Sequence, residues 1–161
     1  MKLLMRLVYN LYRLFCRVTR PTVIGVRTLL LQNEQLLLVK HTYQEHWYFP
    51  GGAVKRGESL VDAAHREAHE EAGVTMTGEL ALLGMYWSFE EGKSDHIAVF
   101  VGTEFTVGAR LDRWEIADCR SFSLHALPSD LSPACARRLD EYQRTPGPYT
   151  GSYTGSYIGP W

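Results

Sequence analysis

Residues 51–74 read GGAVKRGESLVDAAHREAHEEAGV, and their spacing predicts how the rest of the chain is arranged. After the glycine pair and a short polar loop, we expect a helix from Ser59 to Ala72. Ser59 is a good N-cap, because its hydroxyl can accept a hydrogen bond from a free backbone N–H of the first turn. Gly73 should end the helix, since glycine readily takes the left-handed conformation found just after helix C-termini.

Three carboxylates lie on one side of this predicted helix. Glu67, Glu70 and Glu71 are spaced i, i+3 and i+4 and fall within an arc of about 100°. Stacked carboxylates repel one another, so the arrangement needs a compensating cation. Mg²⁺ prefers oxygen ligands and is typically held by carboxylates together with substrate phosphates. For the EAHEE run alone, a solvated acidic helix face is the better interpretation.

The longer spacing favours the metal site instead. The chain fits the pattern G-x5-E-x7-R-E-U-x-E-E-x-G-U, where U is apolar, at Gly52, Glu58, Arg66, Glu67, Glu70, Glu71 and Gly73. This pattern strongly resembles the Nudix box, and by it the chain is identified as a member of the Nudix hydrolase family. The box covers residues 52–74, and the flanking strands extend the resemblance to residues 21–144. The resemblance implies an α/β fold, an α/β/α sandwich with a mixed β-sheet.

The resemblance also implies a metal site. Nudix hydrolases use Mg²⁺ (or Mn²⁺) to cleave a phosphoanhydride bond in a nucleoside diphosphate linked to another moiety. By resemblance, Glu70 and Glu71 are the primary metal ligands, and Glu67 is a ligand or an orienting group. The carbonyl of Gly51 can join the metal shell.

Catalytic residues are expected close to the metal. Glu67 and Glu70 are candidates, and Arg66 should orient a glutamate through an ion pair, because its guanidinium does not lose its proton. Many family members add an acid from the loop before the last core strand, where Glu115 is the best-placed residue. A solvated position for Glu115 is equally consistent with the sequence, and Glu90, Glu91 and Asp95 are rivals on another loop.

Substrate-binding residues are harder to predict. Gly52 would let the backbone approach a ligand closely, and Glu58 would support the adjoining loop. Trp47 could stack on a base or sugar, although a core position is the alternative. The substrate could be a nucleotide sugar, ADP-ribose or a nucleoside triphosphate. A catalytically inactive Nudix-like module that senses nucleotides or binds a partner is the alternative function.

Composition narrows the class of protein. The chain has 161 residues, 45% of them hydrophobic, and a net charge of −1, so it can bury a core and has no general attraction to nucleic acid. Its three cysteines are odd in number and widely spaced. This usage is typical of a reduced, cytoplasmic chain rather than of a disulfide framework or a zinc site.

The first segment, residues 1–20, is a predicted basic amphipathic helix. It has five Lys or Arg residues and no acid, with an apolar stripe on the other side. Arginines interrupt it too often for a membrane span or a signal peptide. Two settings remain open: an anionic inner-membrane surface, with peripheral contact through this helix, or docking on its own domain or across a homodimer.

The remaining segments complete the prediction. We expect strands at residues 22–32, 35–41, 47–49, 79–89, 95–105 and 117–124, and a helix at 131–142. Residues 106–114 are predicted as a loop. Residues 145–161 are uncharged and rich in Gly, Pro, Ser and Tyr, which is typical of a low-complexity tail. The alternative for this segment is that its aromatic residues pack on a neighbouring element.

Overall fold

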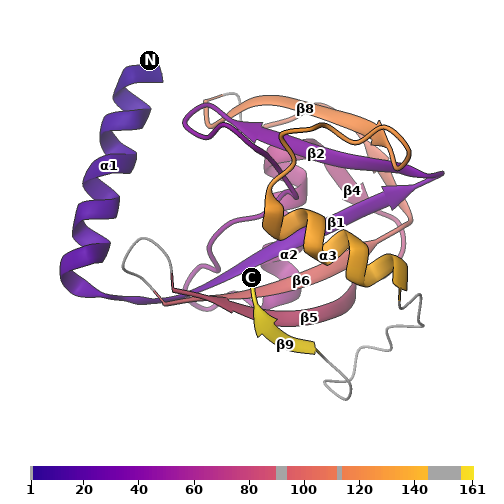
Figure 1. Ribbon diagram of the computed structural model, residues 1–161. Helices are drawn as coiled ribbons and strands as arrows, with labels where there is room; N and C mark the ends of the chain where they lie inside the picture. The colour runs from indigo at the N-terminus through magenta and orange to yellow at the C-terminus, as the bar shows by residue number, and fades with distance from the viewer. Residues whose placement is uncertain (1, 90–93, 112–113, 145–156) are drawn as a thin grey trace.

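The computed structural model describes residues 2–89, 94–111, 114–144 and 157–161. Its elements, shown in Figure 1, are α1 (Lys2–Thr19), β1 (Thr22–Gln32), β2 (Gln35–His41), β3 (Trp47–Tyr48), α2 (Leu60–Ala72), β4 (Val74–Met76), β5 (Ala81–Ser88), β6 (Ser94–Gly102), β7 (Phe105–Val107), β8 (Ile116–Ser123), α3 (Pro133–Arg144) and β9 (Tyr157–Pro160). The predicted strands and helices are present, with ends shifted by a few residues.

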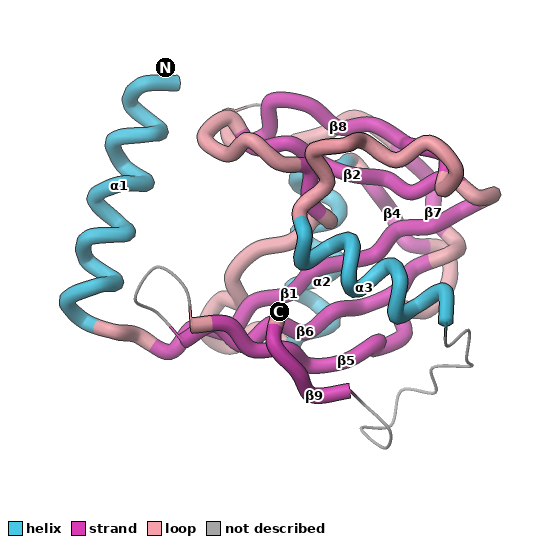
Figure 2. The backbone as a smooth tube through the Cα atoms, in the orientation of Figure 1, coloured by secondary structure: helices cyan, strands magenta, loops and turns pink. Residues whose placement is uncertain are grey.

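The main sheet is mixed. Its strands follow the order β3-β2-β1-β6-β5-β9, and β8 lies off this path and pairs with β2 along its whole length. β1 is antiparallel to β2 and parallel to β6, whereas β5 is antiparallel to β6 and parallel to β9. β4 and β7 form a separate antiparallel pair at one end (Figure 2). The observed sheet is therefore mixed, as the predicted fold requires.

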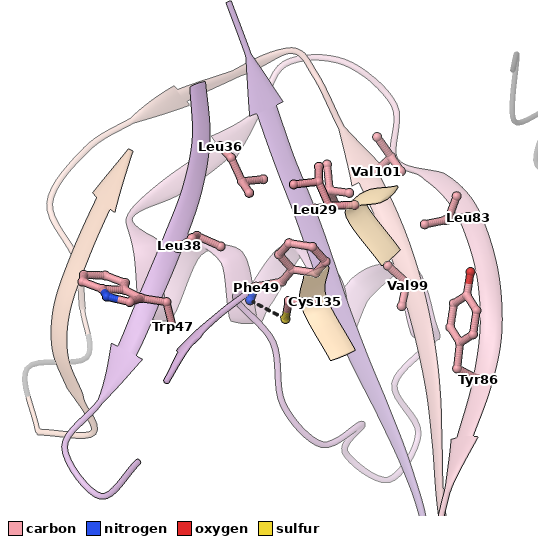
Figure 3. Packing of buried hydrophobic residues seen from close by; sticks show 11 residues of the cluster. Leu29, Leu36, Leu38, Trp47, Phe49, Leu83, Tyr86, Val99, Val101 and Cys135 are labelled. Atoms are coloured by element: carbon pink, nitrogen blue, oxygen red, sulfur yellow. Dashed lines mark hydrogen bonds between the residues drawn. The ribbon is translucent and has the colours of Figure 1, made fainter. Parts of the chain in front are cut away.

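Helices cover both faces of the sheet. Successive strand residues point to opposite faces, so Leu29 and Leu30 of β1 enter different clusters. On the face toward α3, Leu29 packs with Phe49 and Cys135 (Figure 3), and the amide of Phe49 donates to the Cys135 sulfur at 3.4 Å. On the opposite face, Leu30 packs against Ala68 of α2. This three-layer packing confirms the α/β/α sandwich.

α2 has the predicted ends and a small-residue face. The hydroxyl of Ser59 accepts from the amide of Asp62 at 3.1 Å, and Gly73 ends the helix with φ of 67°. The fully buried positions along α2 include Ala64 and Ala68, and their small side chains let the helix backbone lie close to the sheet. α2 is therefore held at both ends and along its inner side, which fixes the direction of its glutamates.

The segment after β3 runs alongside β1. The amide of Thr28 donates to the carbonyl of Pro50 at 2.8 Å, and the amide of Val26 donates to the carbonyl of Gly52 at 2.9 Å. Gly51 has φ of 148°, and a Cβ there would lie 2.1 Å from the Val26 carbonyl oxygen. Only glycine fits this close approach, so the glycine pair is fixed against the sheet at the point where α2 passes.

Two parts of the chain differ from the prediction. Residues 105–107, at the edge of the expected 106–114 loop, form β7 and pair with β4. At the other end, β9 pairs with β5, and the amide of Trp161 donates to the carbonyl of Trp87 at 2.7 Å. Composition predicts a tail because this segment cannot fold alone. For residues 157–161 the alternative holds instead, since the open edge of β5 supplies backbone partners and the Trp161 ring lies 6.2 Å from that of Tyr86. The rest of the expected tail, residues 145–156, lies outside the described residues.

α1 stands beside the sandwich rather than within a layer (Figure 1). Cys16 is fully buried, whereas Leu11, Leu14, Phe15 and Val18 are each more than half exposed. The apolar stripe of the helix therefore faces away from the sheet. Among the described residues, no helix has the length and hydrophobicity needed to span a membrane.

Candidate active site

A cavity of about 830 Å³ lies between the glycine pair, α2 and α1. Gly51, Gly52, Glu67 and Glu71 line one end of it. Pro50 and β1 hold the glycines, and the capped helix holds the two glutamates, so residues from opposite ends of the box meet at one place. This end therefore places two carboxylates beside the backbone of the glycine pair.

Glu71 is fixed by two contacts. Its side chain is about 6% exposed, and its Oε2 accepts from the amide of Gly51 at 2.8 Å. Its Oε1 lies 3.2 Å from Nε2 of His41, at the end of β2. The other ring nitrogen of His41, Nδ1, is buried without a hydrogen-bond partner among the described residues. A tautomer with the proton on Nε2 would donate to the carboxylate and hold it toward the cavity.

Arg66 gathers the other box carboxylates. Its Nε and Nη2 donate to the two oxygens of Glu58 at 2.7 and 2.9 Å. Its Nη1 donates to Glu67 at 2.6 Å and to Glu70 at 3.2 Å. The hydrogen bonds from Arg66 lower the pKa of Glu58 from its ordinary 4.5 to about 2, and the same contact with Glu58 raises the pKa of Arg66. One guanidinium thus joins the loop before α2 to two glutamates on the helix.

Glu67 lies in a more desolvated place than Glu58. Burial raises its pKa above the ordinary value, and the hydrogen bond from Arg66 opposes that effect. A Cβ on Gly52 would lie 2.7 Å from Glu67 Oε1. Glycine at position 52 therefore leaves the room that the Glu67 carboxylate occupies, which gives this box glycine a steric role.

Arg27 is a site residue that the sequence analysis missed. It lies on β1 and lines the cavity, where its Nη1 donates to the carbonyl of Gly51 at 2.5 Å and to that of Phe49 at 3.2 Å. The carbonyl oxygen of Gly51 has a second lone pair for another partner. A lone arginine inside the otherwise uncharged strand TVIGVRTLLLQ was the signal that could have identified it.

Glu115 lines the same cavity as the box residues. The hydroxyl of Tyr43 donates to Oε1 of Glu115, and burial together with this contact raises the pKa of Tyr43. Its rival Asp95 also lines the cavity, whereas Glu90 and Glu91 lie outside the described residues. Of the four distal acids that the sequence offered, Glu115 and Asp95 therefore line the cavity that the box residues also line.

Trp47 is not where the stacking hypothesis places it. It is about 7% exposed and packs edge-on against Phe122, with ring centroids 4.9 Å apart, in the core on the α3 side. Figure 3 shows it in the same cluster as Leu38. Because neighbouring strand residues face opposite ways, Tyr48 takes the cavity side. Trp47 therefore occupies the core position that the sequence analysis gave as the alternative to stacking on the substrate.

The other predicted site residues divide into two groups. Gly51, Gly52, Glu67 and Glu71 line the cavity with Glu115. Glu70, Arg66 and Glu58 lie next to it but outside its lining. Glu70 is about 39% exposed, and both oxygens of Glu58 are engaged by Arg66. Glu58 also accepts from the amide of Lys55 at 2.9 Å, so it supports the adjoining loop as expected, and its contact with substrate stays a prediction.

The residues present suit a hard divalent cation that is completed by a ligand. In the described part of the chain, no three His, Cys, Asp or Glu side chains are already arranged as a metal cage. Glu67, Glu71 and Gly51 line one end of the cavity, and the Gly51 carbonyl keeps one lone pair besides the hydrogen bond from Arg27. Mg²⁺ usually keeps few protein ligands and takes the rest from water and substrate phosphates, so this donor set fits it.

Comparisons with known proteins bear on the family and the fold of the chain. A model of the NUDIX domain matches residues 20–142. A Bacillus subtilis (strain 168) protein provisionally named as an 8-oxo-dGTP diphosphatase is 32% identical over 114 residues, covering 71% of this chain and 74% of the relative. Diphosphoinositol polyphosphate phosphohydrolase 2 of Rattus norvegicus is 35% identical over 85 residues, covering 52% of this chain and 44% of the relative, so the chain spans less than half of its length.

Solved structures support the fold. The crystal structure of a MutT NUDIX hydrolase from Burkholderia pseudomallei has a TM-score of 0.67 and 22% sequence identity, covering 74% of this chain and 97% of that chain. At this level of identity the similarity concerns the arrangement of the elements alone.

Proposed function

Since this chain belongs to the Nudix hydrolase family, we propose that it hydrolyses a phosphoanhydride bond in a nucleoside diphosphate linked to another moiety, with Mg²⁺ (or Mn²⁺) as cofactor. The substrate class includes nucleotide sugars, ADP-ribose and nucleoside triphosphates. The observation that carries the proposal is the meeting of Glu67, Glu71 and the Gly51 carbonyl at one end of a cavity large enough for such a molecule.

The chain's own residues would divide the work. Glu67, Glu70 and Glu71, with the Gly51 carbonyl, would hold the cation. A bound divalent cation neutralises phosphate charge and makes a bound water more acidic. Arg66 would keep the glutamates oriented through its ion pairs. His41 and the amide of Gly51 would hold Glu71 with its carboxylate toward the cavity.

A carboxylate must take the proton of the attacking water. We assign this role to Glu115, because it lines the same cavity as the box glutamates and Tyr43 fixes one of its oxygens. Asp95 is the second candidate at the same cavity. Glu115→Gln and Asp95→Asn would show which residue is the base. Replacing the base should lower kcat steeply, whereas replacing the other residue should not.

The decisive experiment is a substrate panel. The purified chain is incubated with nucleoside triphosphates, nucleotide sugars and ADP-ribose, with and without Mg²⁺, and the release of phosphate, pyrophosphate or nucleoside monophosphate is measured. We expect hydrolysis of one class that stops when the metal is chelated. If every compound stays intact at saturating Mg²⁺ and Mn²⁺, the chain fits the alternative of an inactive nucleotide-sensing or partner-binding module. The complete set of box carboxylates argues against that alternative.

The second part of the proposal concerns where in the cell the enzyme works. We place it in the cytoplasm, where its three thiols would remain reduced. We further propose that α1 binds the anionic inner-membrane surface. Leu11, Leu14, Phe15 and Val18 are 58 to 77% exposed on a helix that carries no acid, which is the pattern of an interfacial helix. Burial of the same stripe in a homodimer is the competing arrangement.

A further inference from the structure

The cavity extends well beyond its acidic end, and both ends of the chain contribute to it. Val8, Tyr9 and Tyr12 of α1 line it on one side, and Trp161 lines it next to β9. All four residues lie outside residues 20–142, the part that matches the family domain. This wall is therefore added to the hydrolase domain by the chain's own terminal segments.

The wall is rich in aromatic rings that are held in place. Tyr9 stacks on Tyr43 with ring centroids 4.9 Å apart and planes 29° from parallel, and Tyr43 lies 5.3 Å from His41. Trp161 is held by its amide, which donates to the carbonyl of Trp87, and its ring lies 6.2 Å from that of Tyr86. Fixed rings beside a cavity suit a flat group such as a nucleobase, which can stack on them.

The charges on the cavity narrow the choice of ligand. Among the described residues that line it, Arg27 is the one Arg or Lys, whereas five are carboxylates: Glu45, Glu67, Glu71, Asp95 and Glu115. A divalent cation could offset the acidic end for one diphosphate. A ring that carries many phosphates would place several negative groups beside these carboxylates. Phosphates and carboxylates repel one another at this range, and Arg27 alone would not offset them. The lining therefore disfavours an inositol polyphosphate and favours a nucleoside.

We propose that Tyr9, Tyr12 and Trp161 form the nucleobase-binding wall of this enzyme and supply the main part of its affinity for the nucleoside, while the diphosphate lies at Glu67 and Glu71. This inference rests on the proposed function and adds where the organic half of the substrate binds. Stacking of a base on an aromatic side chain tolerates every base, so the wall should favour nucleosides as a class rather than one base.

Binding measurements without turnover test the proposal. The probes are the α,β-methylene analogues of four nucleoside diphosphates and methylenebisphosphonate, which has the same phosphate part and no nucleoside. Dissociation constants are measured by calorimetry with Mg²⁺ for the full chain, for a Tyr9→Ala/Tyr12→Ala variant and for Trp161→Ala. The matched control is Leu11→Ala, on the same helix but 58% exposed and outside the cavity lining.

The expected result is selective. The unmodified chain should bind the nucleoside analogues at least about tenfold tighter than methylenebisphosphonate, and the double variant should lose about tenfold or more of nucleoside affinity. Its affinity for methylenebisphosphonate should be unchanged, which also shows that the variant is folded. Trp161→Ala should lose part of the nucleoside affinity, and Leu11→Ala should lose none.

Two outcomes would overturn the inference in different ways. If all compounds bind equally to the unmodified chain, or if the tyrosine and tryptophan variants keep nucleoside affinity within twofold, the wall does not bind the base, and the proposed function still stands. If neither the nucleoside analogues nor methylenebisphosphonate binds in the presence of Mg²⁺, the proposed function and this inference fail together.

Discussion

The amide of Gly51 donates to Oε2 of Glu71 at 2.8 Å, and this contact joins the entry to the box with the last turn of its helix. The two residues are 20 positions apart, and both line the same end of the cavity. The position of the Glu71 carboxylate therefore depends on a backbone conformation as well as on the helix that carries it.

That dependence predicts a steep penalty for a side chain at Gly51. In Gly51→Ala, the new Cβ would meet the Val26 carbonyl oxygen at 2.1 Å, and the backbone has φ of 148°, so β1 and the loop must separate. We expect the free energy of unfolding to fall by about 3 kcal/mol or more, and hydrolysis to be lost. Urea denaturation followed by circular dichroism measures the change.

Gly57→Ala is the matched control for this substitution. Gly57 also has a positive φ, 82°, but a Cβ there meets nothing within 4 Å. Gly57→Ala should lower the free energy of unfolding only by the strain of a left-handed backbone, about 1 to 2 kcal/mol. Equal destabilisation by the two variants would contradict the close-approach argument for Gly51.

The box glutamates give the second prediction. Glu67→Gln, Glu70→Gln and Glu71→Gln keep the side-chain shape and remove the charge that a cation needs, so each should lower kcat about 10²-fold or more. Steady-state kinetics at saturating Mg²⁺ measure the loss. Glu79→Gln, at an exposed position before β5, is the control and should leave kcat unchanged.

Glu70 is the informative member of that series. The family resemblance makes it a primary ligand, yet its side chain is about 39% exposed and is bound to Arg66 outside the cavity lining. A cation would have to draw it away from Arg66. Full activity in Glu70→Gln would remove Glu70 from the metal site and leave Glu67 and Glu71 there.

The ion pair between Arg66 and Glu58 gives a prediction about pH. Hydrogen bonds from Arg66 lower the pKa of Glu58 in the folded chain to about 2, below its ordinary value of 4.5. The folded state therefore favours the charged carboxylate, and the resulting stability is fully present above about pH 5 and is lost as the pH falls toward 2. We expect Glu58→Gln to be less stable than the unmodified chain at pH 7, with the difference shrinking through that acid range.

Denaturation curves at several pH values test this directly. A difference between Glu58→Gln and the unmodified chain that stays constant down to pH 2.5 would show that the ion pair does not stabilise the fold. Glu79→Gln again serves as the control, because its side chain is exposed and should leave the acid dependence unchanged.

The sequence predicted the parts of this fold that depend on local pattern. β1 and β2 have the predicted bounds, because long runs of branched apolar residues ended by Asn33 and Glu34 leave little choice of structure. Ser59 and Gly73 likewise fix α2 through caps that act within one turn. The meeting of Gly51, Glu67 and Glu71 followed from the resemblance, because the box motif carries the geometry of its fold with it.

Contacts between distant segments could not be predicted in this way. His41 meets Glu71 across 30 positions, and Tyr9 stacks on Tyr43 only because α1 lies beside the sheet. The position of Trp161 follows from the pairing of β9 with the open edge of β5, and no local sequence pattern predicts that pairing. Trp47 shows the same limit, because its side of the strand was set by the packing of α3 and β8 rather than by its own chemistry.

The exposed stripe of α1 gives the last prediction. Leu11 and Leu14 are 58% and 60% exposed, and the helix has basic residues and no acid, so it should bind anionic vesicles. The chain is centrifuged with vesicles of equal parts phosphatidylcholine and phosphatidylglycerol, and the pelleted fraction is measured. We expect the chain to pellet with these vesicles at low salt and to pellet less with pure phosphatidylcholine. The Leu11→Asp/Leu14→Asp variant should remain in the supernatant. Higher salt should weaken binding, because it screens the basic side chains.

Val107→Asp separates binding by α1 from a general effect of a surface charge. Val107 lies on β7 and is 59% exposed, close to the exposure of the two leucines. This variant should pellet as the unmodified chain does. Sedimentation velocity without vesicles tests the competing homodimer: a dimer that the leucine substitutions dissociate, together with pelleting that they leave unchanged, would assign the stripe to a second copy of the chain. The membrane proposal requires the opposite pair of results, because one apolar stripe cannot be buried in lipid and in a partner helix at once.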